Sequence, residues 1–539
     1  MKRPMVQRAA ARTPVLLLLL LVASFFIGVQ CSLDSAMLPD QTALAQGMGP
    51  GGGGGGAMGG GGMGGGGSST VIDPPPGAPF ADPPLANPNS APGVVDVSLD
   101  CRVAPVNLDG TIANLWTYNG SYPAPTIRVH SGDLLRVHFT NSLPDVGLNI
   151  LGHERDLTNL HTHGLHVSPS GNADNMMVMT MSGDSFEYEY DLSKQEPGTI
   201  NFYHPHIHGN VAEQYWNGMA GVLEVVDEIS ALADYETHVM FLKDITLSGN
   251  APEPYTSRMD YMHGKEGNLI MVNGQLNPVL NIRPGQVQRW KIVNGSNARF
   301  YKLSLEGHTL QVIGTEGGLL DKPYALSSIV FSPGERLDVL IKANQSAKAY
   351  RFLSLPYSRG GGSSATQITL LTMAYKGSPA NQALPSVVNP AAMRISPMIA
   401  KTEQMALSMG QGKGYINGIS FQMVGDQMIA HEIHSTLGTY EVWEISNASG
   451  MDHPFHQHVN ACQVLSVTGG DAGYASFYTS APAWKDVVIV PKFGSVRILM
   501  PVMDYPGMTM FHCHIVEHED IGMMGIWHIM DGMGGMDGM

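Results

Sequence analysis

The sequence predicts an all-β protein built from several sandwich or barrel domains. Short runs with β-type patterning recur along the chain, each bounded by Gly, Pro, Asn or Asp, and few stretches carry helical periodicity. These runs include residues 126–129, 134–139, 287–293, 336–341 and 487–490. At roughly 100–200 residues per domain, a chain of 539 residues has room for about three such domains.

An internal repeat supports three copies of one unit. In the first two copies an Asn-Gly pair is followed by Ile-Arg, and then by a Gly and an Asn nine residues apart. The third copy keeps the Asn-Gly pair and the same Gly-to-Asn spacing. The pairs begin at Asn119, Asn273 and Asn417. A turn, a strand and a closing turn account for this spacing.

The chain begins with a segment typical of secretion signals. Basic residues in the first twelve positions precede an apolar run, residues 15–29, which is too short to span a bilayer comfortably. Ala43 and Ala45 offer a cleavage site, which predicts a signal segment at 1–45. A lipoprotein anchored through Cys31 and an uncleaved anchor are the alternatives. We therefore expect export to the periplasm or the extracellular space, with a membrane tether possible through the N-terminus.

Composition and the repeat divide the rest of the chain. A Gly-rich and then Pro-rich stretch predicts a flexible linker at 46–93. The repeat predicts β-domains at 94–230, 231–378 and 415–539, with a second linker at 379–414. The net charge of −16, spread over scattered acidic residues, argues against nucleic acid as a partner. The sequence leaves the oligomeric state open.

The cysteines are too few for a scaffold built on disulfides. Cys513 lies between two histidines, which points to metal chemistry. Cys101 and Cys462 fit either a disulfide formed in an oxidising compartment or two buried free thiols.

Ten of the 21 histidines fall into four tight clusters. The clusters are His161-Thr-His163, His204-Pro-His206, His453-Pro-Phe-His456-Gln-His458, and His512-Cys-His514 with His518. One His-x-His pair is commonplace, but four clusters in one chain, one of them around a cysteine, predict metal centres.

The fourth cluster predicts a blue-copper site. A thiolate, two imidazoles and a weak sulfur ligand hold a copper ion that accepts and passes on one electron. Cys513 and His518 supply the thiolate and one imidazole, and Met523 supplies the axial thioether. The second imidazole is His453, from the third cluster.

The remaining His-x-His pairs predict a second centre. Because alternate residues of a strand face opposite sides, His512 and His514 point away from the copper held by Cys513. Together with the pairs at 161/163, 204/206 and 456/458 they give eight imidazoles, the number that a three-copper cluster needs. Neutral imidazole suits copper, and the lack of clustered thiolates argues against iron–sulfur and structural zinc.

With these motifs the chain resembles a three-domain multicopper oxidase of the laccase type, from about Val94 to the C-terminus. The motifs stand in the family's order as HTHG, HPHIHG, HPFHQH and HCHIVEHEDIGMM, and NGSYPAPT at 119–126 resembles a first-domain signature. The resemblance implies three cupredoxin-like Greek-key β-barrel domains. It places the trinuclear cluster between the first and third domains and makes the second a spacer.

The resemblance also assigns ligands to four copper ions. The type 1 ligands would be His453, Cys513, His518 and Met523. The type 2 ligands would be His161 and His456. The type 3 pair would take His163, His204, His206, His458, His512 and His514.

Two carboxylates resemble family residues that help deliver protons to dioxygen. Glu519 directly follows His518, and Asp174 lies just downstream of the first motif. An axial Met523 is expected to hold the type 1 potential down, which favours easily oxidised substrates.

The sequence therefore predicts an oxidase that takes single electrons from a reductant and reduces dioxygen to water. Phenols and aromatic amines are the leading substrates, and Cu(I) or another metal ion, Mn(II) or Fe(II), is the alternative. The 33 methionines, with groups at 176–181 and 393–409, fit either Cu(I) handling or the filling of irregular cores. A non-catalytic copper carrier or electron-transfer protein is the alternative from another class, but it needs no trinuclear cluster.

Overall fold

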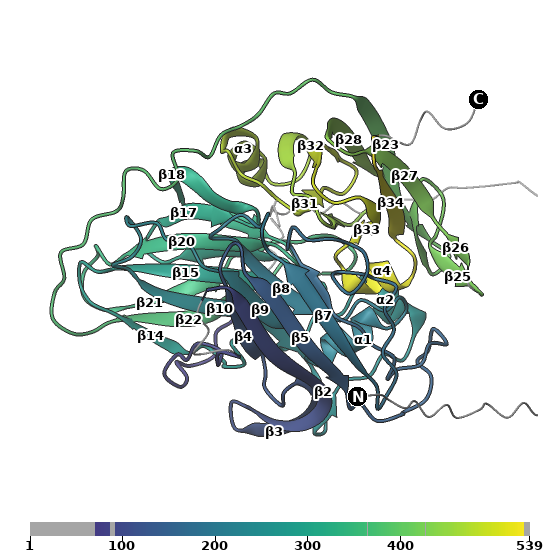
Figure 1. The fold of residues 1–539 in the computed structure, drawn as a ribbon. Helices are drawn as coiled ribbons and strands as arrows, with labels where there is room; N and C mark the ends of the chain where they lie inside the picture. The colour runs from purple at the N-terminus through teal and green to yellow at the C-terminus, as the bar shows by residue number, and fades with distance from the viewer. Residues whose placement is uncertain (1–70, 87–91, 364, 426, 533–539) are drawn as a thin grey trace, which may run out of the picture. The chain divides into compact units, whose positions relative to one another are not determined.

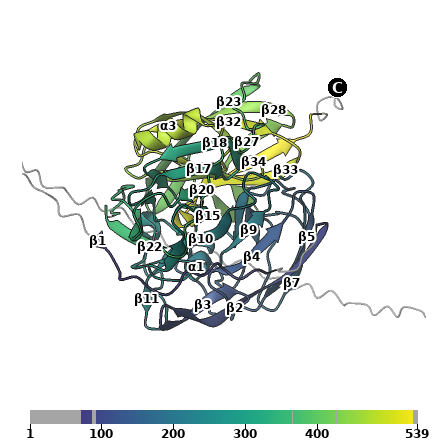
Figure 2. The same cartoon turned by 90° about the vertical axis from the view of Figure 1, so that its left-hand side faces the viewer.

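The computed structural model describes residues 71–86, 92–363, 365–425 and 427–532. They form three successive β-domains, which confirms the all-β prediction (Figures 1 and 2). The predicted signal segment, Cys31 and the Gly-rich part of the first linker lie outside the described residues. Among the described residues, no helix is both long enough and apolar enough to cross a membrane.

The first domain packs two four-stranded sheets together. One sheet has the order β3 (Thr111–Tyr118), β2 (Val94–Leu108), β5 (Leu134–Asn141) and β7 (Ser185–Asp191). The other has the order β4 (Ala124–Val129), β9 (Gly221–Val225), β8 (Ile200–His204) and β6 (His161–His163), and α1 (Val211–Trp216) lies between β8 and β9 in the chain. Inward-facing residues such as Leu99, Val137 and Tyr203 form the core between the sheets.

The second domain also has two sheets. The first has the path β1 (Val71–Ile72), β22 (Gln367–Tyr375), β21 (Ala349–Ser354), β16 (Tyr301–Leu305) and β19 (Ile329–Phe331), with β14 (Val279–Ile282) also paired to β22. The second has the order β13 (Leu269–Val272), β10 (Glu236–Ile245), β15 (Val287–Asn294), β20 (Arg336–Lys342), β17 (Leu310–Thr315) and β18 (Gly318–Leu326). A small ribbon, β11 (Leu247–Ser248) and β12 (Ala251–Pro252), precedes α2 (Arg258–His263).

The third domain repeats this plan. One sheet has the order β24 (Lys413–Ile416), β23 (Lys401–Gly410), β28 (Thr439–Asn447), β32 (Ser495–Val502) and β30 (Gln463–Thr468). The other has the order β27 (His431–Thr436), β34 (Met524–Met530), β33 (Gly507–Cys513), β29 (His453–Gln457) and β31 (Val487–Val490). The hairpin β25 (Gln422–Val424) and β26 (Gln427–Ile429) and the helices α3 (Ala472–Ser480) and α4 (Val516–Asp520) complete it. Both α1 and α2 contact α4 (Figure 1).

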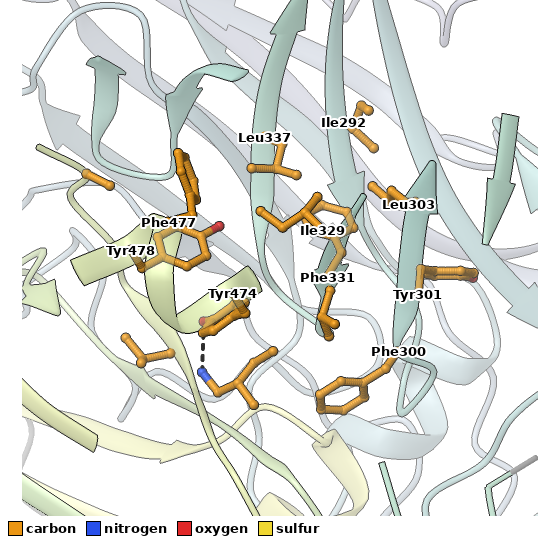
Figure 3. Packing of buried hydrophobic residues seen from close by; sticks show 14 of the residues in the cluster. Ile292, Phe300, Tyr301, Leu303, Ile329, Phe331, Leu337, Tyr474, Phe477 and Tyr478 are labelled. Atoms are coloured by element: carbon orange, nitrogen blue, oxygen red, sulfur yellow. Dashed lines mark hydrogen bonds between the residues drawn. The ribbon is translucent and has the colours of Figure 1, made fainter. Parts of the chain in front are cut away.

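Helix α3 packs the third domain against the second. Its Tyr474, Phe477 and Tyr478 belong to one continuous core with Ile329 and Leu337 of the second domain (Figure 3). Full burial of a large apolar side chain contributes about 1.5–3 kcal/mol to stability. This shared core therefore fixes the third domain, which carries Cys513, against the second.

Two predicted linkers are shorter than expected. Residues 401–410 form β23, which pairs in parallel with β28, so the linker predicted at 379–414 ends by Lys401. Within the linker predicted at 46–93, β1 pairs with β22. The edge strand of a sheet has backbone N–H and C=O groups without partners. An extended segment beside that edge can pair with them even if the segment has the amino-acid composition of a flexible linker.

Cys101 and Cys462 are free thiols in two different cores. The disulfide alternative is therefore wrong, and the free-thiol alternative is correct. Burial raises the pKa of both thiols, so each behaves as a small apolar side chain.

Candidate metal centre

Three predicted type 1 ligands meet in the third domain. Cys513 ends β33, His453 begins β29, and His518 lies on α4. The Cys513 Sγ atom lies 3.5 Å from His453 Nδ1 and 3.6 Å from His518 Nδ1, and the two Nδ1 atoms are 3.2 Å apart. A metal with bonds of about 2.0 Å to nitrogen and 2.3 Å to sulfur needs ligand atoms at about these separations. All three side chains are fully buried.

The outer nitrogens of both imidazoles are hydrogen-bonded, which leaves Nδ1 free to bind metal. His453 Nε2 lies 2.7 Å from Ser449 Oγ, and His518 Nε2 lies 3.3 Å from the carbonyl oxygen of Met262 in α2. Such partners fix the tautomer and the ring orientation of a metal ligand. The fourth predicted ligand, Met523, is buried beside them, and its backbone nitrogen donates to the His518 carbonyl at 2.8 Å.

The eight remaining predicted ligands converge where the first and third domains meet. They come from β6, from the end of β8, from β29 and the loop after it, and from the end of β33. His206 Nε2 and His458 Nε2 lie 3.1 Å and 3.2 Å from His512 Nε2. His163, His204 and His514 form a second group whose ligand atoms lie within 4.8 Å of one another. All eight side chains are buried.

Unpaired nitrogen atoms show that these histidines fit metal ions. The buried Nε2 atoms of His161, His204 and His456, the Nδ1 atom of His163 and both ring nitrogens of His514 have no hydrogen-bond partner. A buried polar atom without a partner costs about 1–3 kcal/mol, and bound ions remove that cost. Burial also lowers the pKa of His163, His204 and His456, which keeps these imidazoles neutral and able to bind metal.

Both predicted proton-transfer carboxylates lie against the histidine cluster. Asp174 Oδ2 is 2.9 Å from His161 Nδ1, which turns His161 Nε2 toward the centre. The oxygens of Glu519 lie 3.4 Å from His206 Nδ1 and 3.2 Å from His512 Nδ1. Burial, and then the neighbouring Asp520, raises the pKa of Glu519.

Sequence reasoning missed a buried ion pair beside the same cluster. Asp486 Oδ1 lies 3.2 Å from His163 Nε2, and its backbone oxygen lies 2.8 Å from His456 Nδ1. Arg336 Nη1 donates to Asp486 Oδ1 at 2.6 Å, and Arg336 Nε donates to the Ile200 carbonyl at 2.7 Å. No motif marks either residue. Only the packing of three domains brings them together.

Arg336 changes the expectation for the second domain. It belongs to β20 of that domain, yet it contacts the first domain at Ile200 and the third at Asp486. The second domain is therefore more than a spacer, because it supplies the cation that holds a carboxylate against two cluster histidines.

The buried histidines predict that the metal-free protein is destabilised by mild acid. Burial lowers the pKa of His453 and His512 from 6.5 to about 3, and it also lowers the pKa of His206, His458 and His514 well below 6.5. Below pH 6.5 these histidines are protonated in the unfolded chain but remain neutral in the folded chain. The free energy of unfolding therefore decreases as the pH is lowered, by about 1.4 kcal/mol per pH unit for each such histidine.

Denaturant unfolding of the metal-free protein at roughly pH 7 and pH 5 measures this dependence. We expect a large drop in the free energy of unfolding at the lower pH. A flat profile would show that the histidines titrate normally and are accessible to water.

Comparison with known proteins agrees with the fold. Three family models described as multicopper oxidase match residues 100–230, 235–378 and 398–532. The multicopper oxidase mco of Staphylococcus aureus is 28% identical over 429 residues, which cover 77% of this chain and 84% of the relative. A laccase of Bacillus stratosphericus is 27% identical over 501 residues, covering 82% and 96% of the two chains.

Solved structures show the same similarity. A multicopper oxidase from Campylobacter jejuni, described as a metallo-oxidase, is 26% identical with a TM-score of 0.72, covering 86% of this chain and 98% of its own. The chain belongs to the multicopper oxidase family, and its three domains are cupredoxin-like. A cell division protein FtsP from Xenorhabdus nematophila is also similar, at 27% identity over 76% of this chain and 84% of its own, so the activity has to be argued from the site.

Proposed function

We propose that this protein oxidises a reducing substrate one electron at a time and reduces dioxygen to water with four of these electrons. The observation that carries the proposal is the position of Cys513, a residue of the three-ligand site, between His512 and His514 of the eight-histidine cluster. Bound copper would supply the one-electron and dioxygen chemistry, with type 1, type 2 and type 3 ions held as the sequence motifs indicate. A simple copper carrier needs no such link.

The chain's own residues hold the two centres in fixed register. Phe455 pairs with Cys513 and His456 pairs with His512 across β29 and β33, so each strand carries ligands of both centres. Rigid strands keep metal ligands in place better than loops do. The covalent path from Cys513 to either neighbouring histidine therefore has a constant length.

Two carboxylates would handle the protons that oxygen reduction consumes. Glu519 contacts His206 and His512 from one side, and Asp174 contacts His161 from another. Burial raises the pKa of Glu519, so that carboxyl keeps its proton to higher pH than an ordinary glutamate and is suited to donate it. We assign proton delivery to Glu519 and, with it, to Asp174.

Phenols and aromatic amines are the proposed substrates. A cavity of about 260 Å³ opens next to the end of α2, which caps His518, and Glu266 and Arg359 are among its lining residues. The cavity admits a small aromatic ring, and Glu266 would accept the proton that a phenol loses with its electron. Electron transfer would then run through His518.

Oxidation of a metal ion is the second candidate. Helix α2 carries Met259, which is exposed, and Met262, whose carbonyl oxygen accepts from His518. Thioethers select Cu(I) among the candidate ions. The Campylobacter jejuni neighbour described as a metallo-oxidase supports this candidate, and the laccases among the relatives support the first.

Oxygen uptake by the copper-loaded protein tests the proposal and separates the substrates. We expect uptake with a simple phenol, at four substrate radicals per dioxygen, and a marked loss in Glu266→Gln. Uptake with Cu(I) that drops in Met259→Leu plus Met262→Leu would favour metal oxidation instead. A blue, fully loaded protein that consumes no oxygen with either substrate would refute the oxidase assignment.

We also propose export, on the basis of the basic and apolar N-terminal segment. Fractionation of cells that make the full chain is expected to place it outside the cytoplasm. Recovery of the uncut chain in the cytoplasm would contradict this.

A further inference from the structure

Five methionines gather at the junction of the first and third domains. Met510 and Met524 are buried in a small core with Phe421 and Ile526, and the half-buried Met176, Met428 and Met508 pack against that core. They come from the loop after β6, from the hairpin β25–β26, and from β33 and β34. We call these five residues the methionine cluster.

The methionine cluster directly borders two cluster histidines. Met524 pairs with His512 across β33 and β34, and the Met510 carbonyl accepts from the His458 backbone N–H at 3.2 Å across β29 and β33. Side chains at opposed positions of an antiparallel pair share a face, with Cβ atoms about 5 Å apart. The thioethers of Met510 and Met524 therefore lie on the face that carries the two imidazoles.

A third histidine meets the cluster through an aromatic contact. Phe421, which packs with the five methionines, lies edge-on to His208 with ring centroids 4.7 Å apart. His208 is two residues from His206, and its buried Nδ1 atom has no hydrogen-bond partner. The methionine cluster thus borders His458 and His512 directly and approaches His206 through His208. His512 Nε2 lies 3.1 Å from His206 Nε2 and 3.2 Å from His458 Nε2.

Further methionines continue from the cluster to solvent. Met423 is 41% exposed and pairs directly with Met428 across β25 and β26. Met177 and Met179, next to Met176 in the chain, are 40% and 65% exposed. Methionines therefore occur at the surface, in the half-buried layer and in the buried core beside the imidazoles.

Buried ligands need a path by which metal reaches them. Thioethers are soft, uncharged ligands that select Cu(I) and bind it without releasing a proton. We propose that the methionine cluster is a Cu(I) transit site that loads the trinuclear cluster through His206, His458 and His512. The step is ligand exchange: Cu–thioether bonds break as Cu–imidazole bonds form, and no electron moves. The inference rests on the proposed copper centre.

A second opening supplies the matched control. A cavity of about 500 Å³ is lined by Met393 and Met503 and by Asp486, which contacts His163 and His456 of the histidine cluster. Methionines at that opening have no backbone pairing with a cluster histidine among the described residues. Replacing them tests whether any methionine near the centre has the same effect.

The rate of copper uptake tests the proposal without reference to oxidase activity. Metal-free protein would receive Cu(I) without oxygen, or Cu(II), in separate runs, and the copper bound to the protein would be measured over time after free ions are removed. The variant is Met428→Leu, Met510→Leu and Met524→Leu together, since leucine keeps the volume. We expect about tenfold slower Cu(I) loading, the effect of ~1.4 kcal/mol of lost binding, and unchanged Cu(II) loading.

The controls separate soft-ligand binding from packing. Met393→Leu plus Met503→Leu is expected to load both ions at the wild-type rate. The copper-filled wild type is expected to bind Ag(I), a redox-inert soft ion, and the triple variant is expected to lose that binding.

Three outcomes would overturn the transit site: normal Cu(I) loading by the triple variant, equal slowing with both copper ions, or no Ag(I) binding by the wild type. A wild-type chain whose histidines take up no copper at all would overturn the proposed function as well. Normal loading by the triple variant would overturn the transit site alone.

Discussion

Replacing Cys513 by serine is expected to abolish the blue absorption band and nearly all oxygen uptake. The Cys513 Sγ atom lies 3.5 Å from His453 Nδ1 and 3.6 Å from His518 Nδ1, and it is the thiolate of the predicted ligand set. A serine hydroxyl is a hard, weakly acidic group and does not replace a thiolate at such a site. Optical spectra, copper content and oxygen uptake measure the effect.

Copper bound by the eight histidines shows whether Cys513→Ser loses only the three-ligand site or is misfolded. The eight histidines do not include Cys513, so the Cys513→Ser protein is expected to keep the copper that they bind. Cys462→Ser is the matched control, because Cys462 is an equally buried free thiol in the core shared by the second and third domains. Cys462→Ser should lower stability and keep the blue band. A coloured, active Cys513→Ser protein would contradict the ligand assignment.

The fold was predictable because its signals are local. Short apolar runs between turn residues predict strands wherever they occur, and the repeated Asn-Gly, Gly and Asn positions mark equivalent turns. Asn119, Asn273 and Asn417 all adopt positive φ in the structure, which is the conformation that such turns require. The ends of the linkers were not predictable, because β1 and β23 form by pairing with strands far away in the chain.

Some residues of the candidate site were also predictable from local sequence, and others were not. Each ligand pair is a local motif, and the strand alternation that separates Cys513 from its neighbours follows from the sequence alone. Asp486 and Arg336 were missed because neither is near a motif, and they meet only after three domains have packed. The methionine cluster was visible only as composition, since Met176 and Met510 lie far apart in the sequence and pack together only in the fold.

Replacing Glu519 by glutamine is expected to lower turnover about 10²–10⁴-fold, the usual range for loss of a general acid. Burial raises the pKa of Glu519, so its carboxyl, which lies against His206 and His512, keeps its proton to higher pH than an ordinary glutamate does. Glutamine keeps the size and shape of the side chain beside His206 and His512 but has no acidic proton to give. Reduction of the blue centre by substrate without oxygen should stay normal, while reoxidation by dioxygen should slow, and stopped-flow absorbance measures both.

Glu517→Gln supplies the control on the same helix. Glu517 is also buried with a raised pKa, but its Oε1 atom accepts from the Tyr255 hydroxyl at 2.6 Å. Its other hydrogen-bond partners among the described residues, Lys265 and Asn297, are not cluster imidazoles either. Reoxidation in Glu517→Gln should therefore stay close to wild type. If both variants slowed reoxidation equally, the effect would belong to the helix and not to proton delivery by Glu519.

The pH dependence of folding distinguishes a proton donor from a structural residue. Because the folded pKa of Glu519 is raised, its contribution to stability is complete below the unfolded pKa and is lost as the pH rises through the folded pKa. Glutamine does not titrate, so metal-free Glu519→Gln should gain stability relative to wild type as the pH increases. If Glu519→Gln is more stable than wild type at high pH and still slow in reoxidation, the slow step results from the missing acidic proton and not from loss of folded structure.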